Sequence, residues 1–290
     1  MRRAALIFAS ILLAVAGIWS MLSGSPERIP AGWSWEANFV GTVTWPDPQA
    51  GAFPDAGELG LYERALSIAS AADRPTAVTL KDDYVIRDPI TDEVTWRYTV
   101  HSRVDPATGM HVDPSHHGEY VVFPRDVERR SYVLRMNYLK GVPLSFIKET
   151  TIEGLRVYLF GYKGRGEYTE SYAGTAEYPG VQVAADQEIR CADDQFSFLV
   201  WVEPMTGEAL KLAERCDSGD YVFNVSTNAP VSAVLRWGGE TAGIDVLRRA
   251  ERVRKERLQL QLSEYGPLAL GLAAVGLGGL GLMCRRRARP

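Results

Sequence analysis

The chain has 290 residues, of which 36 are acidic and 32 basic, and its formal net charge is −4 at pH 7. Because many of its arginines lie near the two ends, the middle of the chain is more acidic still. This argues against nucleic acid as a partner, since nucleic-acid binding needs a basic footprint. The length is sufficient to bury a sizeable hydrophobic core.

The N-terminal residues 1–24 are predicted to form a membrane anchor. Arg2 and Arg3 precede 19 uncharged residues, Ala4 to Leu22. A cleaved signal peptide is the alternative, but the apolar stretch is longer than the usual signal core of about 7 to 15 residues. We therefore favour an uncleaved transmembrane helix.

Residues 25–243 are expected to form a mainly β, antiparallel extracytoplasmic domain. Alternation of apolar residues predicts a first strand over Trp33 to Trp45. Leu61 to Ser70 fits either a short helix or a strand. Further strands are predicted at 76–87, 93–103, 110–112, 120–123, 131–138, 144–150, 155–162, 181–190, 196–202, 208–215 and 221–225.

A short motif occurs twice in this region. Val-Asp-Pro-Ala-Thr-Gly at residues 104–109 (the first motif turn) recurs 98 residues later as Val-Glu-Pro-Met-Thr-Gly at residues 202–207 (the second motif turn). Proline at a turn corner, an acid that caps the turn and a final glycine are typical of a hairpin turn. We expect two related lobes at about 33–140 and 141–240, although the same motif could simply be a common way to make a hairpin.

Residues 244–264 are predicted to form a basic amphipathic helix. Such a helix can cap the β domain or lie on anionic lipid headgroups that attract its cations, and a solvated rigid connector is at least as good an interpretation. The proposed membrane-surface residues are Arg248, Arg249, Arg252, Arg254, Lys255 and Arg257.

The next segment, residues 265–284, is predicted to form a second transmembrane helix, followed by a basic cytoplasmic tail at 285–290. Gly266 to Cys284 is a run of 19 uncharged residues, and four arginines follow it. Because basic residues flank both spans on their outer ends, the positive-inside rule places both termini in the cytoplasm and the main domain on the other side of the membrane. The six cations of the basic helix lie on the outer side and strain this assignment.

Small residues form a stripe along the second span and predict close helix packing, either with the first span or with another copy in a homo-oligomer. An alternative is that such residues are simply frequent in membrane helices. The stripe consists of Gly271, Ala274, Gly278 and Gly281.

Two side-chain groups are candidates for covalent or metal chemistry. Cys191 and Cys216 are the expected disulfide pair if the domain is exported, and two buried free thiols are the alternative. The chain's four histidines, His101, His111, His116 and His117, fall within 17 residues and define a weak candidate metal site. Because no nucleophile motif such as G-x-S-x-G is present, we expect no enzyme activity and no cofactor.

Several segments, taken in order, resemble the bacterial porin PorA family. The matching stretches are Trp96 to Val100, Asp105 to Gly109, Gly118, Phe123 to Pro124, Glu128 to Tyr132, Glu149 to Phe160, Val202 to Gly207 and the entry of the last helix at Pro267 to Leu268. The resemblance covers roughly residues 1 to 284. It implies a double-anchored envelope protein with an exported β domain and no established catalytic residues.

These observations predict a membrane-anchored binding or scaffold protein of the cell envelope. Its expected partners are the lipid bilayer and, as a ligand, a lipid or a cell-wall component. The alternative function, which the family resemblance suggests, is that of a component of a channel assembly.

Overall fold

The computed structural model describes residues 28–47, 49–50, 52–55, 57–74, 76–88, 90–135, 141–166, 183–193, 195–262 and 265. Glu27–Val253 form one compact unit, and the chain beyond Val253 belongs to a second one. In the described part of the chain, no helix has the length and apolar character needed to cross a membrane. Both predicted spans, 4–22 and 266–284, lie outside the described residues.

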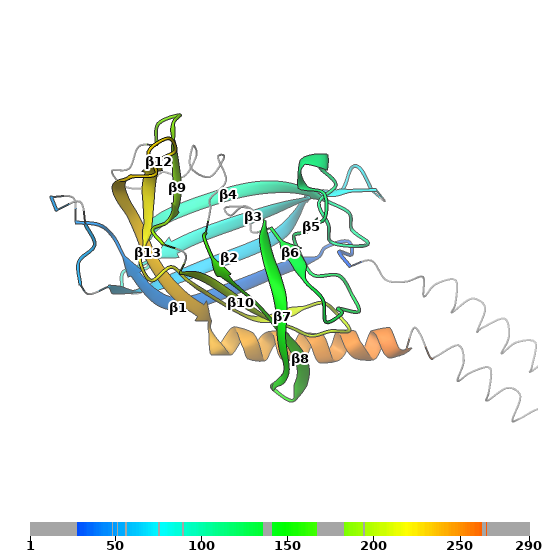
Figure 1. Ribbon diagram of the computed structural model, residues 1–290. Coiled ribbons are helices and arrows are strands. Elements are labelled where there is room, and N and C mark those ends of the chain that lie inside the picture. The colour runs from blue at the N-terminus through cyan, green and yellow to red at the C-terminus, as the bar shows by residue number, and fades with distance from the viewer. Residues whose placement is uncertain are drawn as a thin grey trace, which may run out of the picture. The chain divides into compact units, whose positions relative to one another are not determined.

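The predicted antiparallel β architecture is confirmed: the described unit is one curled 13-stranded sheet (Figure 1). Its path runs β4-β3-β2-β1-β13-β11-β10-β8-β7-β6-β5, and the β5–β6 pair is parallel. Off this path, β12 pairs with β13, and β9 pairs with β12. The strands are β1 Ser34–Thr44, β2 Glu58–Ser70, β3 Val78–Arg87, β4 Val94–Val104, β5 Glu119–Tyr120, β6 Tyr132–Leu134, β7 Val142–Ile152, β8 Leu155–Gly164, β9 Gln187–Cys191, β10 Phe196–Val202, β11 Ala209–Arg215, β12 Asp220–Asn224 and β13 Pro230–Thr241. A short 3-10 helix, η1, covers Pro114–His116.

Strand β13 is central to the sheet, yet sequence reasoning missed it. It pairs with β1, β11 and β12. Its Gly238-Gly239 pair looks like a turn in the sequence, because glycine weakens a strand. In the structure the close approach is made by Gly41 of β1, where an added Cβ would lie 2.2 Å from the Gly238 carbonyl oxygen, whereas one on Gly238 would meet Arg215 at 3.4 Å.

The two ends of the strand order are joined by isolated bridges. Val104 at the end of β4 bridges His111, and Met110 bridges Tyr120 of β5. The curl encloses an aromatic-rich core, in which Tyr62 contacts Phe39 and other rings. Burial of each such side chain contributes about 1.5–3 kcal/mol, so this core is the main source of stability.

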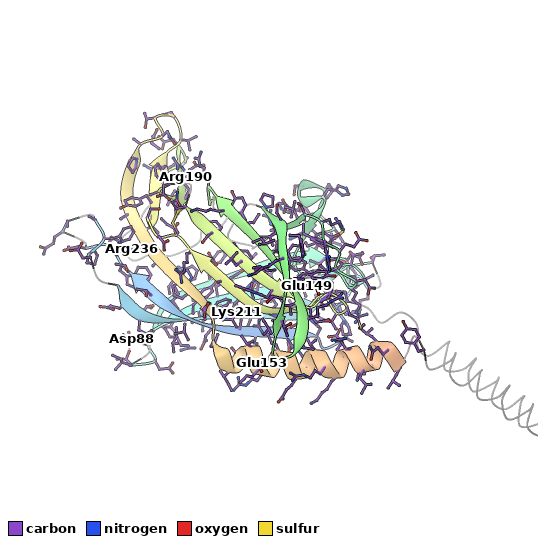
Figure 2. All side chains as sticks on the ribbon, turned by 60° about the horizontal axis from the view of Figure 1, so that its bottom comes forward. Asp88, Glu149, Glu153, Arg190, Lys211 and Arg236 are labelled. Carbon is purple, nitrogen blue, oxygen red and sulfur yellow. A yellow bond between two sulfur atoms is a disulfide. The ribbon has the colours of Figure 1, made fainter. Side chains whose placement is uncertain are left out.

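The C-terminal helix, residues 243–262, begins directly after β13. Its part up to Val253 belongs to the same compact unit as the sheet and lies along it (Figure 1). Ala250 and Val253 pack on Leu155 and Val157 of β8 and on Leu210 of β11. The turn between β7 and β8, labelled by Glu153 in Figure 2, lies beside this helix. The predicted amphipathic pattern therefore buries its apolar face against strands.

Both predicted lobes are parts of the same continuous sheet. Strands β1–β6 fall in the first lobe and β7–β13 in the second, and β1 pairs directly with β13. The unit Glu27–Val253 is compact as a whole. Whether the halves arose by duplication stays a prediction.

Candidate functional site

The two motif turns have the same hydrogen-bonded geometry, as the shared sequence predicts. In the first motif turn, Asp105 accepts a hydrogen bond from Thr108 Oγ1 at 2.7 Å. In the second, Glu203 accepts from both the amide and Oγ1 of Thr206 at 2.8 Å. The acid of each motif thus closes its own turn, as is typical of turn-capping side chains.

Both turns hold the first described residues of the chain. The Ile29 amide donates to the Pro106 carbonyl of the first motif turn at 2.8 Å. Arg28 donates from Nε to the Phe123 carbonyl at 2.7 Å and from Nη2 to the Gly207 carbonyl of the second motif turn at 3.0 Å. Arg28 is only 3% exposed. These contacts fix the point at which the chain enters the sheet.

Glu208, directly after the second motif turn, joins this entry point to the C-terminal helix. Its carboxylate lies 3.7 Å from Arg28 and 2.5 Å from Arg252 of the helix. The Glu208 side chain is 3% exposed, so the two arginines, rather than water, are the partners of its carboxylate. We call Arg28, Glu208 and Arg252 the terminal clamp.

The C-terminal helix also bridges β1 and β11 beyond the end of β13, where no strand of the described chain lies between them. Strand β13 pairs with β1 only along Phe39–Thr44 and with β11 only along Ala213–Arg215, so the strands separate where β13 ends. Arg249 spans this gap and donates to the carbonyls of Ala209 in β11 and Glu36 in β1 at 3.0 and 2.5 Å. Its guanidinium also stacks over Trp35, 4.1 Å from the ring centroid.

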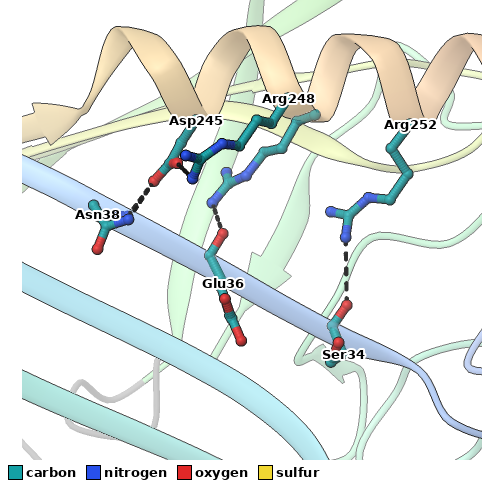
Figure 3. Close-up of a pocket in the computed structure, with 7 residues that line it drawn as sticks. Ser34, Glu36, Asn38, Asp245, Arg248 and Arg252 are labelled. Atoms are coloured by element: carbon teal, nitrogen blue, oxygen red, sulfur yellow. Dashed lines mark hydrogen bonds and ion pairs between the residues drawn. The ribbon is translucent and has the colours of Figure 1, made fainter.

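Asp245 connects the start of the C-terminal helix to β1 (Figure 3). Its carboxylate accepts from the amide and the side-chain nitrogen of Asn38 at 2.7 and 2.8 Å, and pairs with Arg248 at 3.2 Å. A polar pocket of about 220 Å³ lies between β1 and the helix. Of its charged groups, Asp245 pairs with Arg248, and Arg249 and Arg252 donate to backbone carbonyls of β1. Such contacts between the helix and the strand suit a structural joint better than a ligand site.

Arg249 corrects one prediction. It was expected at the membrane surface, but it is 3% exposed inside the joint. Burial lowers the pKa of its guanidinium to about 10, an effect that Glu208 opposes and Arg252 reinforces. Arg248 is 70% exposed, and Arg254 and Lys255 are exposed as well, whereas Arg252 is held in the terminal clamp and Arg257 is half-buried.

The sheet interior holds a second buried ion pair. Arg64 contacts both carboxylate oxygens of Asp82, at 3.1 and 2.7 Å, and Tyr84 donates to the same carboxylate at 2.7 Å. Burial opposes the charge on Arg64, but Asp82 outweighs it and the pKa of Arg64 is raised. The nearby cavity, lined by Trp35, Leu66 and neighbouring residues, has a volume of about 30 Å³. That space is too small for an acyl chain.

Three of the four predicted metal ligands lie together, and the fourth does not. His101, His111 and His116 line an open pocket of about 480 Å³ next to the junction of β4 and β5, whereas His117 is exposed and is not part of its lining. The imidazole rings of His111 and His116 are 5.2 Å apart. We call this cavity the histidine pocket.

The predicted disulfide is confirmed. Cys191 at the end of β9 is bonded to Cys216, which follows β11. The bond closes a loop that contains the hairpin of β10 and β11. The predicted packing stripe of Gly271, Ala274, Gly278 and Gly281 lies outside the described residues.

Sequence reasoning missed the terminal clamp. Arg28 preceded the first predicted strand and matched no motif, and Glu208 was only the first residue of a predicted strand. The one available signal was position, because Arg28 is the first cation after the predicted N-terminal span and Glu208 directly follows a repeated motif.

Comparisons with known proteins identify a family. A search of curated proteins finds no match. A family model described as Porin PorA matches residues 3–283, which is nearly the whole chain. The protein therefore belongs to the porin PorA family.

Proposed function

We propose that this protein is a non-catalytic scaffold of the cell envelope, tethered to the bacterial cytoplasmic membrane by the predicted spans at both ends. The terminal clamp carries the proposal. Arg28 is the first described residue after the predicted N-terminal anchor, and Arg252 belongs to the helix that leads toward the second predicted span. Through Glu208, the β unit holds both connections in one place.

The outer face of the C-terminal helix supports the lipid bilayer as a partner. Ile244 and Leu247 are 56% and 46% exposed, and Arg248 stands beside them. Exposed apolar residues next to cations are typical of helices that lie at a membrane interface. Leu258 and Leu262 continue the exposed apolar positions in the described part of the helix beyond Val253.

The distribution of buried charges supports a structural function. In the described residues, three of the strongly perturbed groups, Arg64, Tyr84 and Arg249, are held by carboxylates, carbonyls and rings. Such ion-pair networks also shift pKa values without any catalytic role. A lipid or cell-wall ligand would bind outside the small apolar cavity beside Trp35.

Membrane extraction and protease protection test the tether and its orientation. After an alkaline carbonate wash, the full chain should stay in the membrane fraction. In intact spheroplasts, added protease should digest the β unit and spare a tag on the C-terminus. Release by carbonate, or protection of the β unit, would refute the proposal.

A channel component is the second candidate function, and membership of the porin PorA family favours it. The detergent-purified full chain should then give stepwise conductance in planar bilayers and form a cross-linked oligomer. Gly271→Leu and Gly278→Leu should abolish both effects if the predicted stripe forms the contact. A monomeric and silent preparation would rule out this alternative.

A further inference from the structure

The histidine pocket lies next to the place where the chain enters the sheet. It opens between β4 and the 110–116 segment, and the adjacent Arg103 pairs with Asp73 at 2.9 Å. Arg74, next in the chain, donates to the Ile29 carbonyl at 2.9 Å. The pocket of about 480 Å³ thus lies at the same end of the sheet as the terminal clamp, but none of the three clamp residues lines it.

Its lining is rich in hydrogen-bond donors. Arg103 and Arg135 contribute two guanidinium groups, and His101 and His116 contribute imidazoles. Asp113 is the acid in the lining, and it already accepts bonds from the amide and the hydroxyl of Ser115 at 3.1 and 2.9 Å. The lining residues thus include two cations and one acid, and each arginine also pairs with a carboxylate outside the lining, Arg103 with Asp73 and Arg135 with Glu119.

His111 provides a buried polar atom that lacks a partner. The residue is 8% exposed, and its Nε2 has no hydrogen-bond partner among the described residues. Burial, Arg135 and His116 together lower the pKa of His111 from 6.5 to about 4, although Asp113 opposes the shift, so the ring is neutral at pH 7. A buried, unbonded ring nitrogen is costly, and a ligand in the pocket would satisfy it.

Arg135 decides what kind of ligand fits. Its Nη1 lies 2.7 Å from His116 Nδ1 and 3.0 Å from a Glu119 oxygen. As the donor, Arg135 makes His116 Nδ1 the acceptor, which leaves the proton of the neutral ring on Nε2. A metal ion in the pocket would be repelled by this nearby guanidinium. In this tautomer, neither nitrogen of His116 has a free lone pair with which to bind the metal. An anion would be attracted by the same group.

We propose that the histidine pocket binds an oxyanion of the phosphate class, held by Arg135, Arg103 and the imidazoles of His111 and His116. Arginine suits this chemistry because its guanidinium has five N–H donors and pairs with phosphate oxygens in a charge-assisted way. Both contacts described for Arg135 come from one nitrogen. The phosphate can belong to a lipid headgroup or be free in solution.

Calorimetric titration of the detergent-purified full chain tests the site with two probes. Inorganic phosphate represents the free ion, and dihexanoyl phosphatidic acid below its micellar concentration represents a lipid headgroup. Arg135→Gln should weaken binding about 10- to 100-fold, as expected for a lost charge-assisted hydrogen bond. His111→Phe keeps the ring volume but removes Nε2, and should also weaken binding. His117→Gln is the matched control and should bind like the wild type.

The outcomes separate the sources and the alternatives. Binding of phosphate alone identifies a free anion, whereas tighter binding of the short-chain lipid identifies a headgroup, and either result supports the site. If neither probe binds, or if Arg135→Gln and His111→Phe both bind like the wild type, the proposal is wrong. Zinc binding that needs His111 and His116 while neither phosphate probe binds would restore the metal-site prediction instead. Thermal melts of each variant show whether it is folded.

Discussion

Arg28 and Glu208 form an ion pair at 3.7 Å although they come from opposite halves of the chain, and each side chain is 3% exposed. Removal of one partner from a buried pair is far more costly than loss of an exposed pair, because the other charge stays buried. This contact connects the chain's entry into the sheet with the C-terminal helix through Arg252.

Glu208→Gln is therefore expected to lower the free energy of unfolding by about 3 kcal/mol, as for other broken buried pairs. Urea unfolding of the full chain in detergent, followed by tryptophan fluorescence, measures the change. Glu240→Gln is the control, because Glu240 is 55% exposed and pairs with Lys211 at the surface. Equal effects of the two variants would show that the clamp adds no stability.

Two neighbouring arginines of the helix, Arg248 and Arg249, should differ sharply in their contribution to the free energy of unfolding. Arg249→Leu leaves the Ala209 and Glu36 carbonyls without their donor and should lower stability by about 3 kcal/mol. Arg248→Leu removes a charge that is 70% exposed, and should change stability by less than about 0.5 kcal/mol. Thermal melts give the comparison. Similar melting temperatures for both variants would contradict the assigned role of Arg249.

Two glycines with similar backbone angles provide another matched pair. Gly207 has φ +71° and a side chain there would lie 1.9 Å from the Pro124 carbonyl oxygen, whereas Gly154 has φ +73° and no atom within 4 Å. Gly154→Ala should cost about 1 kcal/mol from backbone strain alone. Gly207→Ala should lower the free energy of unfolding clearly more, because the backbone at Pro124 must also move to make room for the methyl group. The measurement is urea unfolding, and equal losses would mean that the second motif turn is not tightly packed.

The stability of the sheet should depend on pH through His111. Burial, Arg135 and His116 lower the folded-state pKa of His111 from 6.5 to about 4, while Asp113 opposes this shift. Between these pH values the unfolded chain binds a proton that the folded chain does not. The unfolding free energy should therefore rise from pH 4 to pH 6.5 and lose this dependence above it.

His111→Phe should flatten that part of the profile, since the variant has no imidazole to titrate at this position. Urea unfolding at half-unit pH steps compares it with the wild type. An unchanged slope would assign the acid sensitivity to other groups.

Much of the fold could be predicted because its signals are local. Apolar alternation located most strands, and the repeated motif identified two turns that share one hydrogen-bond pattern. The expectation that the domain is exported indicated the Cys191–Cys216 bond. Strand β13 escaped prediction because its Gly238-Gly239 pair looks like a turn, and only its pairing with β1 and β11, which lie far away in the sequence, reveals a strand.

The candidate site was harder to predict because its residues are distant in the chain. Arg248 and Arg249 are adjacent and chemically identical, yet one is exposed and the other fills the gap between β1 and β11. The histidines were predicted as a group, but Arg135, which favours an anion over a metal, was not among them.

By itself, the sequence determined the β character of the chain, its turns, its disulfide and its membership of the porin PorA family, since these depend on residue type and local spacing. Only the tertiary structure decided that the sheet is continuous, that Glu208 joins Arg28 to Arg252, and which arginines are buried. The physical reason is that the energy of a charge depends on its solvent exposure and its partners, and both are set by residues far away in the chain.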